Sequence, residues 1–243
     1  ESSDAAFAHA LAIALLRKTR LTLLHSARDI PDGNEWTKFP GVRATLERWG
    51  YLEPGSPRSA VFDELALRVK KVRLRRRSPL AAIQEYLGKH PTDLIVLSTQ
   101  GREGAPGWLR PSVAERVARA TSTMTLFVPN ACRGFVSLED GEISLQRILV
   151  PIATSPSPVA AIEFAVRAAD LADEPLEVIL LHVGEEDGFP QILLPESSGC
   201  RFRQELRSGS VVPEIERAAK DFGVDLIVMA TDGPDGFQGR IQA

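Results

Sequence analysis

The sequence predicts an α/β protein with two doubly wound parallel-sheet domains in tandem. Three observations support this fold class: apolar runs of strand length alternate with helical stretches, the same motifs recur at a fixed spacing, and the composition is that of a folded protein. Hydrophobic residues make up 44% and charged residues 25% of the 243 positions, which excludes disordered, collagen-like and coiled-coil chains.

The first half shows alternating helical and strand patterns. Ala-rich stretches and apolar residues at helical spacing predict the helices, and short continuous aliphatic runs predict parallel strands buried on both faces. A run in which Val and Leu alternate with Lys and Arg predicts a half-buried strand. In order, these are a helix at 7–16, strands at 21–24 and 71–75, a helix at 80–87, a strand at 94–97, a helix at 113–120 and a strand at 124–128.

The second half repeats the alternation from a different starting point. It opens with a strand at 148–152 and continues with a helix at 159–171, a strand at 178–181, a helix at 212–222 and a strand at 226–229. By comparison, the first copy begins inside its first helix, and the second copy stops before a last helix and strand. We therefore expect domain 1 to lack its first strand and domain 2 its last helix and strand.

Two motifs recur at one separation and a third at a larger one. The run Asp-Leu-Ile-Val begins at Asp93 and again at Asp225, 132 positions later, and the stretch from Ser78 has a counterpart at the same separation. Leu-Leu-His ends at His25 and at His182, 157 positions apart. The first copy therefore carries an insertion of about 25 residues between His25 and Ser78. The aromatic residues of this insertion predict either a lid or an arm that packs on the rest of the protein, and we favour the packing arm.

The domain boundary is placed where a turn signal separates the copies. Asp140-Gly141 lies between short alternating segments, a pattern typical of a hairpin. The predicted organisation is domain 1 at 1–134, a hairpin linker at 135–146 and domain 2 at 147–243.

Charge, hydropathy and cysteine content restrict the partners and the compartment. With 29 Lys and Arg against 32 Asp and Glu, the net charge is −3, so no global field favours nucleic acid or anionic lipid. No apolar run approaches the ~20 residues of a membrane helix. Cys132 and Cys200 are too few for a disulfide scaffold or a cysteine zinc site, and the four histidines form no metal motif. We expect a cytoplasmic protein without nucleic-acid, membrane or metal partners.

Together, these motifs resemble a tandem pair of universal stress protein domains. The resemblance rests on Ile148-Leu-Val-Pro-Ile, on Leu-Leu-His after each first helix, on Asp-Leu-Ile-Val before each Gly loop, and on Ser112-Val-Ala-Glu-Arg-Val before a closing strand. It implies a Rossmann-like, five-stranded parallel sheet of the adenine nucleotide alpha hydrolase-like type. It also implies that some members bind ATP, while those that do not still dimerise and act in stress responses.

The loop after the strand at 94–97 is the strongest candidate site. Glycines at the carboxyl end of a parallel strand let backbone N–H groups approach phosphate oxygens, and the following helix N-terminus adds partial positive charge. If the cofactor is ATP, the candidate binding residues are Ser98, Gly101, Gly104, Ser112, Val113 and, in domain 2, Gly233.

The resemblance also identifies departures from the family's ATP pattern of Gly, two residues, Gly, nine residues, then Gly with Ser or Thr. Ser98 and Pro111 occupy two of the three glycine positions, and Pro111 removes a backbone donor. Ser112 fits a phosphate contact, but it equally fits an N-cap paired with Glu115. In domain 2, Ala153 follows the first strand where ATP-binding relatives have an Asp.

Two further features have a functional and a structural interpretation. His25 and His182 end equivalent strands, and we interpret both as packed, hydrogen-bonded residues rather than as catalytic residues. Neither has a Cys, Ser or carboxylate at a spacing that would form a catalytic relay with it. The run 68–77 holds seven Lys or Arg. We interpret it as a solvated strand face, with a docking surface for an acidic partner as the alternative.

The sequence thus predicts a non-enzymatic stress-response protein with no catalytic residues. Pairing between the two domains is expected to replace homodimerisation, with a homo-oligomer and an unknown protein partner as further associations. The alternative is an ATP-binding stress-response module, with weak ATPase activity left open and the phosphate loop in domain 1. A hydrolase or adenylating enzyme is disfavoured, because neither a Walker loop nor a pyrophosphate loop is found.

Overall fold

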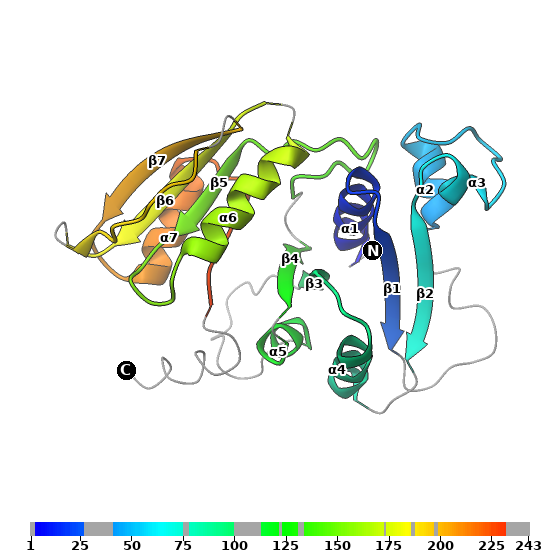
Figure 1. Cartoon of the computed structure of the whole chain (residues 1–243), viewed down its shortest axis with the longest axis horizontal. Coiled ribbons are helices and arrows are strands. Elements are labelled where there is room, and N and C mark those ends of the chain that lie inside the picture. Colours follow the sequence, from blue (N-terminus) through cyan, green and yellow to red (C-terminus); the bar gives the residue numbers. More distant parts are fainter. Residues whose placement is uncertain are drawn as a thin grey trace. The chain divides into compact units, whose positions relative to one another are not determined.

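The chain folds into two compact units, Glu1–Glu142 and Ile143–Ala243 (Figure 1). The computed structural model describes residues 3–26, 41–74, 78–99, 113–121, 123–130, 134–172, 174–185, 188–196 and 199–231. The division between the units falls inside the segment 135–146 predicted as a linker. Within the described residues, no helix has both the length and the apolar character to cross a membrane.

Unit 1 contains helices and two separate pairs of parallel strands. Strand β1 pairs with β2, and β3 pairs with β4. The elements in order are α1 (Asp4–Leu16), β1 (Arg20–Ser26), α2 (Val42–Arg48), α3 (Ala60–Asp63), β2 (Arg68–Leu74), α4 (Pro79–Lys89), β3 (Leu94–Thr99), α5 (Val113–Arg119) and β4 (Met124–Pro129).

Local sequence explains the helices that flank these strands. Helix α1 is rich in Ala and Leu, and it buries residues on more than one side because it packs against β1, β3 and β4. Helix α4 begins where Ser78 caps it: the Ser78 hydroxyl accepts the Ala81 N–H at 3.4 Å, and Pro79 occupies the first helical position.

Unit 2 contains one parallel sheet of four strands in the order β7-β6-β5-β8. The elements are β5 (Arg147–Pro151), α6 (Val159–Ala168), a 3₁₀ turn (Ala169–Leu171), β6 (Leu176–Val183), β7 (Cys200–Arg207), α7 (Val211–Asp221) and β8 (Leu226–Ile227). The core lies in the two middle strands, where Ile148–Val150 and Val178–Leu181 are at most 1% exposed. Ile215 and Ala218 of α7 pack on this core.

The described residues confirm an α/β fold with parallel sheets, whereas the tandem two-domain organisation stays a prediction. Three details of the predicted elements are corrected. Strand β7 was not predicted, because its Arg and Glu residues mask the apolar alternation. Of the strand expected at 226–229, Leu226–Ile227 has strand conformation, and the Val228 N–H still donates to the Leu149 carbonyl at 2.9 Å. The helix expected at 159–171 ends at Ala168 and gives way to the 3₁₀ turn.

Candidate functional site

The carboxyl edge of β3 and β4 holds the described part of the predicted phosphate site. Ser98 lies near the end of β3, and its hydroxyl donates to Oδ1 of Asn130, the residue that follows β4. The Asn130 N–H donates to the Thr99 carbonyl at 2.8 Å, so the two strand ends are fastened together. The Ser98 hydroxyl therefore has a protein acceptor at the place where a nucleotide phosphate was expected.

The other predicted contacts can be placed only in part. Val113 is the first residue of α5, which packs against β3 and β4, so a helix N-terminus does belong to this part of unit 1. Gly101, Gly104, Ser112 and Gly233 lie outside the described residues, as does the side chain of Val113.

In unit 2 an imidazole lies at the carboxyl end of β6, next to the end of β5. His182 Nδ1 lies 3.1 Å from the Ile152 carbonyl oxygen, and because a carbonyl only accepts, Nδ1 carries the hydrogen in this contact. Phe189 packs edge-to-face on the ring, with centroids 5.7 Å apart. A Cβ on Gly184 would come within 2.6 Å of His182 Nε2. The structure thus shows a packed, hydrogen-bonded His182. Its neighbour Phe189 was not predicted, because it belongs to a loop without periodicity.

A second histidine, which the sequence did not single out, joins α1 to the segment after β4. His9 is 1% exposed, and its Nδ1 lies 2.7 Å from the Ala5 carbonyl oxygen. Its Nε2 accepts the Phe135 N–H at 3.1 Å, and the two rings pack edge-to-face at 4.6 Å. Burial lowers the pKa of His9, and the bond to the Ala5 carbonyl opposes this shift only partly. His9 is therefore a neutral acceptor that anchors Phe135.

The insertion anchors the same segment from a different element. Trp49, which follows α2 and is 7% exposed, donates from Nε1 to the Leu138 carbonyl at 3.2 Å, and Arg48 donates to the same oxygen at 3.0 Å. Gly141 lies against the indole, where a Cβ would come within 2.5 Å. In its described part, the insertion is thus a packing arm on the predicted linker.

We expect unit 1 to lose stability as the pH falls below about 6.5, the ordinary histidine pKa. The folded-state pKa of His9 is depressed, so its contribution is present above the unfolded pKa and is lost as the pH falls. Protonated Nε2 can no longer accept the Phe135 N–H. The measurement is the urea midpoint of unit 1 at pH 7.5 and 5.5. His9→Gln should reduce the difference between the two midpoints, and His182→Gln, in unit 2, should not. An unchanged difference in His9→Gln would contradict this role.

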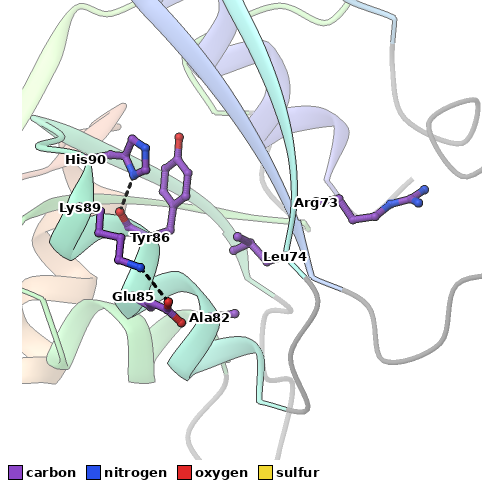
Figure 2. Close-up of a pocket in the computed structure, with 7 residues that line it drawn as sticks. All are labelled: Arg73, Leu74, Ala82, Glu85, Tyr86, Lys89 and His90. Carbon is purple, nitrogen blue, oxygen red and sulfur yellow. Dashed lines mark hydrogen bonds and ion pairs between the residues drawn. The ribbon is translucent and has the colours of Figure 1, made fainter.

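A surface cavity of about 200 Å³ lies between β2 and α4 (Figure 2). The rings of Tyr86 and His90 stack at 4.0 Å with an interplanar angle of 7°, and Lys89 pairs with Glu85 at 2.9 Å. Figure 2 shows Arg73 directed away from both rings. Since Glu85 neutralises Lys89 and none of the predicted phosphate-site residues lines the cavity, it is not the expected nucleotide site. The lining residues are Arg73, Leu74, Ala82, Glu85, Tyr86, Lys89 and His90.

The basic run on β2 is exposed at Arg68, Lys70 and Lys71, but Arg73 is half-buried and its Nε is buried without a hydrogen-bond partner. Arg68 and Lys70 are exposed and lie over aromatic rings, Arg68 at 5.3 Å from the Phe62 centroid and Lys70 at 6.0 Å from that of Tyr86. These exposed residues agree with the predicted solvated strand face, whereas the half-buried Arg73 departs from it. Residues 75–77 of the run lie outside the described part.

Comparison with known proteins identifies the family. The model of the universal stress protein family matches residues 1–129, more than half of the chain. The chain belongs to the universal stress protein family. A crystal structure of a universal stress protein from Archaeoglobus fulgidus DSM 4304 superposes with a TM-score of 0.56 at 15% identity, over 93% of this chain and 82% of that one. At this identity the likeness concerns the fold. A search of curated proteins finds no match.

Proposed function

We propose that this chain is a cytoplasmic, non-enzymatic universal stress protein that acts without bound nucleotide. Family membership supports a general role in the stress response. Two contacts at the carboxyl ends of strands support the proposal that no nucleotide is bound. The Ser98 hydroxyl is bonded to Asn130, and His182 is packed against Ile152 and Phe189.

Pairing between the two units is the second part of this proposal. Parallel sheets need their outer strands covered or paired, and an exposed apolar edge favours association. Strand β4 pairs on one side with β3, and its side chains Met124 and Phe127 are 40% and 38% exposed. Because these two side chains are three residues apart, they lie on opposite faces of the sheet and share only the strand itself. Strand β4 is therefore our candidate for the association of unit 1 with unit 2, with a homo-oligomer through the same strand as the other form.

The alternative function is an ATP-binding stress-response module. One observation favours it: α5 follows β3 in the chain, leads into β4 and packs against both strands, and a helix N-terminus stabilises phosphate charge. In this alternative, Gly101, Gly104, Ser112 and Val113 would hold the phosphates.

The two functions are separated by thermal unfolding with and without Mg-ATP. A ligand at a hundred times its dissociation constant stabilises a protein by about 2.7 kcal/mol, which is readily detected. We expect Mg-ATP to leave the unfolding temperature of the parent chain unchanged. We expect the same result for Gly101→Val. A shift in the parent chain that Gly101→Val abolishes would establish the alternative.

A further inference from the structure

Strand β2 concentrates positive charge that its own strand pair does not neutralise. Neither β2 nor its partner β1 contains an acidic residue. The register places Arg20 of β1 beside Arg68 of β2, and both side chains are exposed. Like charges on neighbouring strands repel each other, so an anion beside them is stabilising. The cations of β2 are Arg68, Lys70, Lys71 and Arg73.

Two of these cations contact aromatic rings instead of carboxylates. Among the described residues, neither Arg68 nor Lys70 forms an ion pair, and they lie over the rings of Phe62 and Tyr86. A cation–π contact positions a cation without cancelling its charge. Glu85, on the same helix as Tyr86, is paired with Lys89 at 2.9 Å. The exposed charge of β2 therefore has no counter-charge in the part of the chain that the structure describes.

Arg73 adds a donor that lacks an acceptor. Its side chain is half-buried, and within the described residues its buried Nε makes no hydrogen bond. Figure 2 shows the side chain directed away from Tyr86 and His90, so these residues do not supply the acceptor. A buried N–H without an acceptor is costly. Strand β2 thus lacks acceptors as well as counter-charges.

The comparable strand of unit 2 neutralises two of its arginines internally. Strand β7 also pairs with a single strand, β6, in the described residues. Its Arg203 lies 3.5 Å from Glu205 and 4.0 Å from Glu177. Its Arg207 lies 2.8 Å from Asp221 of α7. A basic strand of this chain can therefore carry its own counter-charges, and β2 differs from β7 in this respect.

The outer edge of β2 selects the kind of partner. One edge pairs with β1, and no strand among the described residues pairs with the other. Such an edge presents backbone groups that can accept a further strand. Successive side chains point to opposite faces, so Arg68 and Lys70 lie on one face and Arg73 on the other. A second copy of β2 would bring like charges together, whereas an acidic strand would place carboxylates beside cations on both faces.

We propose that β2 binds an acidic protein segment in an extended conformation, which adds as a strand to this edge. Because the cations lie on both faces, the segment carries a run of about four consecutive Asp or Glu residues. Backbone hydrogen bonds hold the segment, and its carboxylates provide the selectivity. This inference does not depend on the proposed function.

The test adds a synthetic peptide of about eight glutamates to the full chain, with a glutamine peptide of the same length as the uncharged control. At saturating glutamate peptide, hydrogen exchange read by mass spectrometry should slow by at least about tenfold in β2, with β6 and β7 unchanged. The glutamine peptide should leave β2 unchanged. Added salt should weaken the binding of the glutamate peptide, because it screens exposed charges.

Substitutions of exposed cations locate the binding surface. The double variant Arg68→Gln with Lys70→Gln should weaken the binding of the glutamate peptide by at least about fivefold. The matched control is Arg201→Gln, which removes an exposed cation from β7 and should leave the binding unchanged. All three side chains are exposed, so their replacement removes no core packing.

Three results would overturn the proposal. One is unchanged exchange in β2 with the glutamate peptide. Another is equal protection by a glutamate peptide methylated on all its backbone nitrogens, which would show that charge alone binds and that no strand is added. The third is a short single-stranded DNA that protects β2 as strongly as the peptide and is weakened by the same double variant, because the surface would then be a nucleic-acid site.

Discussion

Leu180→Ala is expected to lower the free energy of unfolding of unit 2 by about 3 kcal/mol, whereas Leu23→Ala should cost unit 1 only about 1 kcal/mol. The two leucines occupy the same place in the Leu-Leu-His motif. Leu180 is fully buried, with β5 and β7 as its neighbouring strands, so its removal leaves a cavity. Leu23 is half-buried with β2 as its neighbour, so water already reaches part of it.

Hydrogen exchange of the two strands is the suitable measurement for this pair. All three tryptophans, Trp36, Trp49 and Trp108, belong to unit 1, so tryptophan fluorescence cannot report the unfolding of unit 2. Peptides that cover β1 and β6 report each unit separately. Equal losses for the two substitutions would contradict the difference in burial between Leu23 and Leu180.

Gly134→Ala is expected to destabilise unit 1 by about 3 kcal/mol or more, because strain and overpacking add. Gly134 has a φ of +70°, and a Cβ there would overlap the buried His9 imidazole, which is held by Ala5 and Phe135. The matched control is Gly55→Ala. Its φ is +83°, but nothing lies within 4 Å of the added Cβ, so only the backbone cost of about 1 kcal/mol applies.

The measurement for the two glycines is urea unfolding followed by tryptophan fluorescence. Trp49 is buried against the predicted linker and reports unit 1 directly. Similar midpoints for Gly134→Ala and Gly55→Ala would mean that the contact between His9 and the Gly134–Phe135 segment does not hold in solution.

Much of the fold could be predicted from local patterns. The continuous apolar runs Leu94–Leu97 and Val178–Leu181 both form parallel strands, and the Ala-rich stretch of α1 forms a helix. The expected burial on both faces is confirmed for Val178–Leu181 and wrong for Leu94–Leu97, which is half-buried. Strand β7 could not be predicted, because its side chains are mostly Arg, Glu and Gln and it pairs only with β6 in the described residues.

The site was less predictable, because its contacts join residues distant in the sequence. The motif placed Ser98 at a strand end, but nothing local indicates that Asn130, 32 residues later, accepts its hydroxyl hydrogen bond. His9 lies in a uniformly apolar helix, and its acceptor role appears only once Phe135, 126 residues away, is packed against it. Such partners depend on tertiary packing, which residue spacing does not encode.

Nucleotide content is the most direct test of a nucleotide-independent universal stress protein. The full chain would be purified without added nucleotide and denatured, and its supernatant would be assayed for ATP and ADP. Because the Ser98 hydroxyl is bonded to Asn130 and His182 is bonded to the Ile152 carbonyl where β5 and β6 end, we predict no stoichiometric nucleotide. One ATP or ADP per chain would contradict the proposed function.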